Sequence, residues 1–284
     1  MKEIGQIAVI GAGVMGCGVS LNLALKGYPV ILKDISADAL EDAKSKIKSD
    51  YRMVKMMNRS LVTESLDEVL QKITFQLTYN NFNKVDLVIE NVNELVDIKI
   101  GVIKEIKDLC KPDTIFAINT SCIPITKLAS HFVDPSKVIG LHFMNPVPLK
   151  AMVETIKGFH TSQETIDVIK AFLKSIDKQS VVVNDSPGFV ANRLSHLFMN
   201  EAAFVVYESI ANPADVDAIF KKGYMHSMGP LETADLIGLD TVLDSLNVLY
   251  DNFKDSKFRP CPLLQKMVDA GLLGRKSGEG FYKY

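Results

Sequence analysis

The sequence predicts an α/β fold, with a doubly wound, mostly parallel sheet over residues 1–185 followed by an all-α domain over residues 186–284. Two observations lead to this prediction. Short apolar runs alternate with helical stretches through the first two thirds of the chain, as expected of parallel strands joined by crossover helices. After the sequence VVVNDSPGF the alternation stops, and apolar residues recur only at helical spacing. The boundary between the two domains is therefore expected near Asp185–Pro187.

Eight segments of the first domain carry the signal of a β-strand. The stretch between the second and third of these, residues 37–72, is charged and helical in character. It is longer than a simple crossover requires, so we expect a helical excursion there. The expected strands are 6–10, 29–34, 73–77, 85–90, 114–118, 137–143, 150–156 and 180–183.

The second domain shows helical periodicity from Phe189 onward. Asn212 and Pro213 are typical of a helix N-cap followed by the first helical position. Further periodicity covers residues 239–253 and 262–270. The apolar residues that set the first helical spacing are Val190, Leu194, Leu197, Phe198 and Val205.

Composition excludes several classes of function. The 284 residues are 47% hydrophobic, which is ample for a packed core, and a formal net charge of -2 gives no basic field for nucleic acid or an anionic membrane. We find neither a cleavable leader nor an apolar run long enough to span a membrane, so a cytoplasmic protein is expected. The cysteines have no CxxC or Cys/His ligand spacing, which predicts neither a disulfide nor a metal site; they are Cys17, Cys110, Cys122 and Cys261.

The first 34 residues carry a dinucleotide-binding motif. In the sequence GAGVMG, Gly11 permits a tight turn, Gly13 lets a pyrophosphate approach the backbone, and Gly16 allows close packing of helix on strand. Glycine-rich turns also occur for packing alone. Here the motif follows the strand IAVI, opens a helix and precedes Asp34 at the end of VILKD. That acid can bind both ribose hydroxyls and would repel a 2′-phosphate, so the motif predicts a Rossmann-type NAD site rather than an NADP site.

His142 and Glu154 form a candidate catalytic pair. A histidine between Leu141 and Phe143 in an apolar strand is ordinarily a satisfied core residue. The turn at residues 145–148 lets the next strand, AMVETI, return alongside, which would bring Glu154 within reach of the imidazole. A carboxylate on one ring nitrogen fixes the tautomer and stabilises the imidazolium formed when the other nitrogen takes a proton. The pair therefore predicts a general base for alcohol oxidation by hydride transfer.

Two further polar segments lie where α/β folds place ligands. Asn119, Thr120 and Ser121 follow the strand TIFAI, although such residues also form turns without any function. Asn192 lies early in the first helix after the linker, facing the expected cleft. Capping and linker chemistry explain the neighbouring Ser, Pro and Gly, but they do not explain Asn192.

A run of basic residues falls in the helical excursion. It is either a solvated helix face, balanced by Glu41, Asp42 and Asp50, or a landing site for a polyanionic carrier such as coenzyme A. The run consists of Lys44, Lys46, Lys48, Arg52, Lys55 and Arg59.

Taken together, these motifs resemble the L-3-hydroxyacyl-CoA dehydrogenase family, especially its short bacterial 3-hydroxybutyryl-CoA dehydrogenases. The resemblance covers nearly the whole chain. It is carried by VIGAGVMG, NTSCIPIT, GLHFMNPVP, DSPGFVANR, MGPLETADLIGLDT and GRKSGEGFYKY, in the order and spacing of the family.

The resemblance implies a role for each candidate residue. His142 would be the catalytic base, Glu154 its orienting partner, and Ser121 and Asn192 polar contacts to the substrate's oxygens. It also implies a homodimer formed through the helical domain. On the cofactor side, Asp34 would hold the adenosine ribose. The resemblance adds five further residues on that side, Glu94, Lys99, Asn119, Asn145 and Lys276.

One departure from the family pattern concerns the strand end IENVNE. Asn91 stands where the family commonly has a small apolar residue, and both Asn91 and Asn93 are expected to affect the cofactor or substrate mouth. The segments IENV, MGPLETADLIGLDT and FRPCPLLQKMVDAGLLGRKSG are similar to a branch associated with polyketide biosynthesis. Substrates of that branch, such as a glyceryl group, are carried on an acyl carrier protein.

Two interpretations of other classes stay open beside a thioester dehydrogenase. One is a non-catalytic dinucleotide-binding or structural protein, against which the set Ser121, His142, Glu154 and Asn192 argues. The other is a β-hydroxyacid dehydrogenase with a catalytic lysine and a free acid substrate, which lacks the HFMNP motif.

Overall fold

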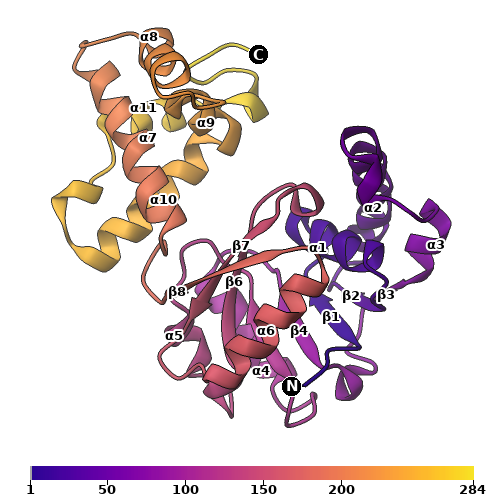
Figure 1. Cartoon of the computed structure of the whole chain (residues 1–284). Coiled ribbons are helices and arrows are strands. Elements are labelled where there is room, and N and C mark those ends of the chain that lie inside the picture. Colours follow the sequence, from indigo (N-terminus) through magenta and orange to yellow (C-terminus); the bar gives the residue numbers. More distant parts are fainter. Residues whose placement is uncertain (1) are drawn as a thin grey trace. The chain divides into compact units, whose positions relative to one another are not determined.

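The computed structural model describes residues 2–284, which form two compact units divided between Asp185 and Ser186 (Figure 1). The described part of the first unit contains one eight-stranded sheet, in the order β3-β2-β1-β4-β5-β6-β7-β8. All eight predicted strands are confirmed, with ends that differ by at most two residues. Their bounds are β1 Ile7–Ile10, β2 Val30–Lys33, β3 Ile73–Gln76, β4 Leu87–Glu90, β5 Ile115–Ile118, β6 Val138–Phe143, β7 Met152–Lys157 and β8 Gln179–Asn184.

The sheet is parallel except where β7 runs antiparallel to β6. The helical excursion is also confirmed, as α2, a short 3₁₀ turn at Arg59–Leu61 and α3, beside the β2–β3 end of the sheet (Figure 1). This doubly wound arrangement is the one that the alternating apolar runs predict. The helices of the unit are α1 Val14–Leu25, α2 Ala37–Met57, α3 Leu66–Gln71, α4 Val96–Ile106, α5 Ile125–Ala129 and α6 Gln163–Ser175.

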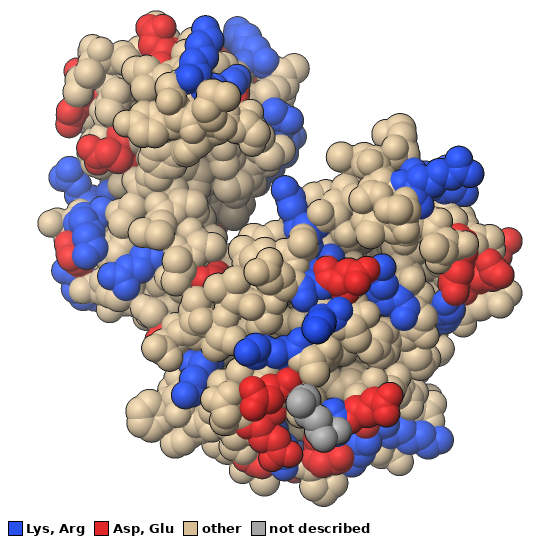
Figure 2. Space-filling view, in the orientation of Figure 1, with Lys and Arg blue, Asp and Glu red and all other residues tan. Residues whose placement is uncertain are grey.

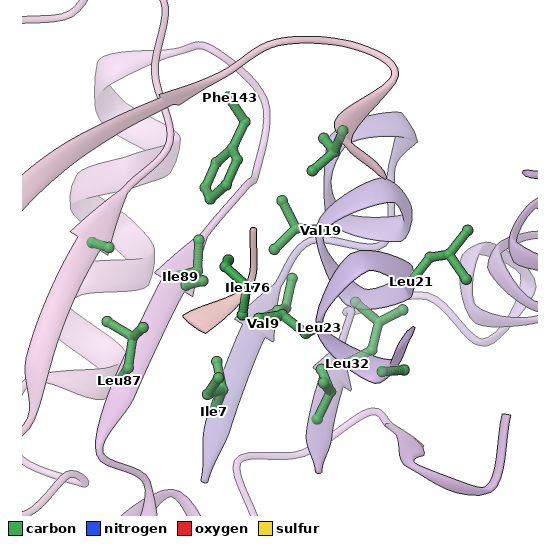
Figure 3. Close-up of a cluster of buried hydrophobic side chains, with 14 of the residues drawn as sticks. Ile7, Val9, Val19, Leu21, Leu23, Leu32, Leu87, Ile89, Phe143 and Ile176 are labelled. Atoms are coloured by element: carbon green, nitrogen blue, oxygen red, sulfur yellow. The ribbon is translucent and has the colours of Figure 1, made fainter. Parts of the chain in front are cut away.

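The core of this unit surrounds β1, which is buried on both faces. Ile7 and Val9 belong to one cluster with side chains of α1, α2 and α6. Figure 3 shows the α1 side chains Val19, Leu21 and Leu23 of this cluster beside the strands. The intervening Ala8 and Ile10 are buried as well but lie outside that cluster. Strands that are covered on both faces have continuous apolar sequences, as the IAVI sequence of β1 shows.

The second unit is helical over its described residues, as predicted. The Asn212 side chain accepts a hydrogen bond from the backbone N–H of Asp215 at the start of α8, so this expected cap is confirmed. Buried Asp235 fixes the C-terminal segment by accepting from the backbone N–H groups of Phe281 and Tyr282, both at 3.0 Å. The helices are α7 Ala191–Tyr207, α8 Pro213–Ala218, α9 Pro230–Ile237, α10 Leu239–Phe253 and α11 Pro262–Asp269.

A buried lysine holds the connection between β6 and β7. Lys178 Nζ donates to the carbonyl oxygens of Val147 and Lys150, at 2.7 and 2.9 Å, and burial lowers the pKa of this ammonium to about 8. The Val147 side chain in turn packs against Gly18 of α1, where an added Cβ would lie 3.2 Å from it. The β6–β7 hairpin is therefore fixed against the helix that follows the glycine motif.

The strand order reverses direction between β1 and β4. From β1 the chain builds β2 and β3 outward on one side, then returns to place β4, β5 and β6 on the other. In open α/β sheets such a switch point leaves a crevice outside the carboxyl ends of the strands, where ligands bind. The loops after β1, β4 and β5 meet there.

Candidate active site

Two cavities open at this switch point, and Asn91 and Val92 line both of them. One, of about 230 Å³, is lined by Met15, Asn91, Val92, Glu94, Asn119, Thr120, Ser121, His142 and Phe143. The other, of about 240 Å³, is lined by Ile10, Gly11, Gly13, Lys33, Asp34, Ile35, Asn91, Val92, Asn93, Ile98 and Val102.

The three glycines of the motif differ in the room that the fold leaves for a side chain. Gly11 has φ 97°, and a Cβ there would lie 2.7 Å from the carbonyl oxygen of Asn91. A Cβ at Gly16 would lie 1.8 Å from the carbonyl oxygen of Gly11, so the helix packs directly on the turn. At Gly13 a Cβ would meet nothing within 4 Å. The fold itself does not require a glycine at position 13, whereas a pyrophosphate resting on the start of α1 would.

Asp34 lies at the end of β2 and lines the 240 Å³ cavity. Its Oδ2 accepts from the backbone N–H of Ala12 at 2.7 Å, and its Oδ1 accepts from that of Ser36 at 3.1 Å. These bonds fix the carboxylate between the glycine turn and the start of α2. An ionised carboxylate accepts about four hydrogen bonds, so sites for a ribose diol remain. The residues present therefore fit the adenosine end of NAD.

The expected contact between His142 and Glu154 is confirmed. The antiparallel register of β6 and β7 pairs the two residues directly, and His142 Nδ1 lies 3.1 Å from Glu154 Oε2. Glu154 is 3% exposed and His142 9%. This carboxylate selects the tautomer in which Nδ1 carries the proton, which leaves Nε2 as the basic nitrogen.

Ser121 and Glu94 lie on the same cavity wall as His142. Glu94 Oε1 accepts from the Thr120 hydroxyl at 2.5 Å, from the Ser121 N–H at 2.7 Å and from the Ser121 hydroxyl at 3.2 Å. It also accepts from the Cys122 N–H at 3.2 Å. Glu94 thus holds the loop after β5 and fixes the Ser121 hydroxyl at the cavity.

Asn119 is oriented by two neighbours. Its amide nitrogen donates to Asn91 Oδ1 at 2.7 Å, and its amide oxygen accepts from the Phe143 N–H at 3.4 Å, one residue from the catalytic candidate. Asn91 donates in turn to the carbonyl oxygen of Ile89 at 3.0 Å. The departure from the family pattern at Asn91 thus places a second carboxamide between the two cavities.

Lys99 lies beneath the site and is fully buried. Its Nζ donates to both carboxylate oxygens of Glu90, at 3.1 and 2.9 Å, and to the carbonyl oxygen of Asn119 at 2.9 Å; Glu94 Oε2 lies 3.5 Å away. Burial raises the pKa of Glu90, and the Lys99 charge opposes that rise. Lys99 therefore acts on the loops that line the cavity, and its expected contact with the cofactor stays a prediction.

Besides Gly16, Lys99 and Glu154, three further expected site residues are not among those that line either cavity. Asn145 is exposed just beyond β6. Asn192, the second residue of α7, and Lys276, which is paired with Asp240 at 2.5 Å, belong to the second unit. Their roles toward substrate and cofactor stay predictions.

Sequence reasoning missed Glu90 and the individual role of Thr120. Glu90 was detectable as a charge that ends the apolar strand VDLVIE. Thr120 is buried, and its hydroxyl donates to Glu94 while accepting from the Ile123 N–H at 3.0 Å. Nothing in the sequence distinguishes this threonine from an ordinary turn residue.

Over residues 2–284, no helix is long and apolar enough to cross a membrane. The same residues contain no group of three or more His, Cys, Asp or Glu side chains arranged to hold a metal ion. Cys17, Cys110 and Cys261 form no disulfide.

Family models match almost the whole chain. The model for the 3-hydroxyacyl-CoA dehydrogenase NAD binding domain matches residues 6–186, and that for the C-terminal domain of the same family matches residues 188–284. The chain belongs to the 3-hydroxyacyl-CoA dehydrogenase family. The chain is therefore an NAD-dependent dehydrogenase, and its glycine turn lies in the NAD binding domain of the family.

Curated relatives of this family member match over their full length. It is 43% identical over 282 residues to a probable 3-hydroxybutyryl-CoA dehydrogenase of Bacillus subtilis, with 99% of this chain and 98% of the relative covered. It is 42% identical over 282 residues to the 3-hydroxybutyryl-CoA dehydrogenase of Bradyrhizobium diazoefficiens, with 99% and 96% covered. The crystal structure of (S)-3-hydroxybutyryl-CoA dehydrogenase from Ralstonia eutropha superimposes with a TM-score of 0.94 at 39% identity, covering 99% of each chain.

The glycine geometry predicts opposite outcomes for two alanine substitutions. Gly13→Ala should fold normally, with a Tm close to that of the wild type, and should lose at least about tenfold in NADH affinity because the methyl group occupies the pyrophosphate's place. Gly16→Ala should lower the Tm by roughly 5 °C or more, since the turn must move away from the new Cβ. Thermal unfolding by circular dichroism and titration of NADH fluorescence measure the two effects. Equal Tm losses in both variants would contradict this division of roles.

Proposed function

We propose that this dehydrogenase interconverts a short-chain 3-hydroxyacyl thioester and its 3-oxoacyl form, with NAD as hydride acceptor. The observation that carries the proposal is the His142–Glu154 pair, whose His142 lines a cavity that shares Asn91 and Val92 with the dinucleotide cavity. A base held in one tautomer beside a nicotinamide site suits the oxidation of an alcohol. The names of the relatives support the thioester class and the short acyl chain.

In this proposal His142 Nε2 removes the proton of the 3-hydroxyl group. Glu154 keeps the Nδ1 proton in place and stabilises the imidazolium that forms. Ser121 holds a reacting oxygen from its position on the cavity wall, with Asn192 as a second polar contact. NAD, held by the glycine turn and Asp34, would supply the hydride acceptor for C3, and in the reverse direction His142 returns the proton.

Coenzyme A is the carrier that we favour, and an acyl carrier protein is the alternative. Both present a phosphopantetheine arm, so the catalytic groups need not differ. The basic run on α2 and the 3₁₀ turn after it is partly neutralised, because Lys44 pairs with Glu41 and Lys46 with Asp50, both at 2.5 Å. Lys48, Arg52 and Arg59 have no ion-pair partner within residues 2–284, which leaves cations for the phosphates of a carrier. Figure 2 shows acidic and basic side chains interspersed on the visible face, so any such attraction is local.

A homodimer formed through the helical unit and a cytoplasmic location complete the proposal. Exposed apolar side chains of that unit support the dimer, because isolated monomers rarely leave so many large ones uncovered. Cys17, Cys110 and Cys261 form no disulfide, which fits a reducing compartment. Light scattering should give twice the chain mass, and a monomeric mass would remove the dimer from the proposal. The exposed apolar residues include Leu194, Ile210, Tyr224, Met225 and Leu236.

Substitution of the catalytic pair tests the mechanism. His142→Gln should lower turnover by about two to four decades, with NADH affinity little changed, because general-base catalysis is worth roughly that much. Glu154→Gln keeps the side-chain shape without the charge and should give a smaller loss. Stopped-flow kinetics with acetoacetyl-CoA, alongside NADH titrations, provide the measurement. Near-normal turnover of His142→Gln would reject the base assignment, and no turnover of any short 3-oxoacyl thioester by the wild type would favour a non-catalytic protein.

The carrier is identified by comparing turnover of one acyl group attached to coenzyme A and to an acyl carrier protein. NADH oxidation at about 340 nm should be fast with acetoacetyl-CoA and slower with the group loaded on an acyl carrier protein, if local cations on α2 receive the nucleotide phosphates. Turnover on the carrier protein alone would select the biosynthetic alternative with unchanged chemistry. Free 3-hydroxybutyrate, oxidised as well as its thioester, would instead indicate a β-hydroxyacid dehydrogenase.

A further inference from the structure

Lys33 is a buried cation that the proposed reaction does not use. It is the last residue of β2, directly before Asp34, and its side chain is 3% exposed. Its Nζ lies 4.1 Å from the centroid of the Tyr79 ring. Within residues 2–284 this ammonium has neither a hydrogen-bond acceptor nor a carboxylate at ion-pair distance.

The ammonium of Lys33 reaches the cavity wall without a protein acceptor. Burial lowers the pKa of Lys33, and the charges of Glu105 and Asp34 oppose that effect without direct contact. The Tyr79 ring compensates in part through a cation–π interaction, and it is itself fixed because its hydroxyl donates to Glu105 at 2.6 Å. The N–H donors of Lys33 are therefore held at the cavity without a protein acceptor, where a bound ligand can supply one.

The position of Lys33 indicates which chemical group could supply the acceptor. Lys33 and Asp34 both line the 240 Å³ cavity, whose remaining walls include Ile35, Ile98 and Val102. Apolar walls of this kind suit the faces of a flat base, and Asp34 suits the ribose hydroxyls. What such a nucleoside offers to a donor such as Lys33 is an acceptor atom, either a ring nitrogen of adenine or a ribose oxygen.

We propose that Lys33 is a cofactor-binding residue, which donates a hydrogen bond to the adenosine moiety of NAD. The proposal rests on the assignment of the 240 Å³ cavity to that end of the cofactor. Asp34 then accepts from the ribose while Lys33 donates from the neighbouring position. The adenosine end is bound by one donor and one acceptor that are adjacent in the chain.

Direct binding of adenosine fragments tests this role without any turnover. Titration calorimetry with 5′-AMP should give a Kd raised about tenfold in Lys33→Met, since hydrogen bonds to charged groups contribute at least that factor. Met keeps the length and the apolar stem, and its neighbours are largely apolar. Lys33→Gln keeps a donor without the charge and should lie between; it also serves as the readout should Lys33→Met fail to fold by circular dichroism.

Lys84→Met is the matched control, because Lys84 is an exposed lysine of the β3–β4 connection that lines neither cavity. It should bind 5′-AMP as the wild type does. A second titration with 2′-deoxy-5′-AMP separates the two acceptors. A loss confined to 5′-AMP would identify the 2′-oxygen, and an equal loss with both nucleotides would assign the contact to the base or to another ribose oxygen; either supports the proposal.

Two results would overturn it. Lys33→Met and Lys33→Gln binding 5′-AMP as tightly as the wild type would show that Lys33 makes no contact. A wild type that does not bind 5′-AMP would reject the cavity assignment and the proposal with it. Failure of the proposed dehydrogenase activity can be distinguished from failure of this proposal, because the 5′-AMP titrations do not depend on turnover.

Discussion

The buried ammonium of Lys99 is the interaction on which the site depends. It joins α4 to the end of β4 through Glu90 and to the end of β5 through the carbonyl oxygen of Asn119. Because removing one partner of a buried ion pair leaves an uncompensated charge, these elements are held together strongly. Glu94 and Asn119, which line the cavity and hold Ser121 and the Phe143 N–H, take their positions from this centre.

The catalytic pair depends on a different constraint, the reversal of one strand. Parallel strands bring their carboxyl ends to one edge, so His142 near the end of β6 reaches the crevice. Only because β7 runs antiparallel does Glu154 lie opposite it rather than at the far edge of the sheet. Lys178 fixes the connecting turn, and Val147 packs that turn against α1, so the base and the dinucleotide helix share one rigid frame.

Much of the site could be predicted, because its chemistry lies in local patterns. The glycine spacing fixed the roles of Gly11 and Gly16, and a charge in an apolar strand drew attention to Glu154. The contacts of Lys99 and Lys33 could not be predicted, since both depend on which distant elements cover the side chain. Asn192 and Lys276 belong to the second unit, so their part in the site depends on how the two units meet.

The sequence by itself determined the eight strands, the change to an all-α segment and the class of cofactor, because period, glycine spacing and strand-end acids are local properties. Only the tertiary structure decided that Glu90 pairs with Lys99, that Asn91 holds Asn119, and that Lys33 lines a cavity. The physical reason is that desolvation and partnering of a charge depend on neighbours remote in the chain, whereas strand and turn formation depends chiefly on adjacent residues.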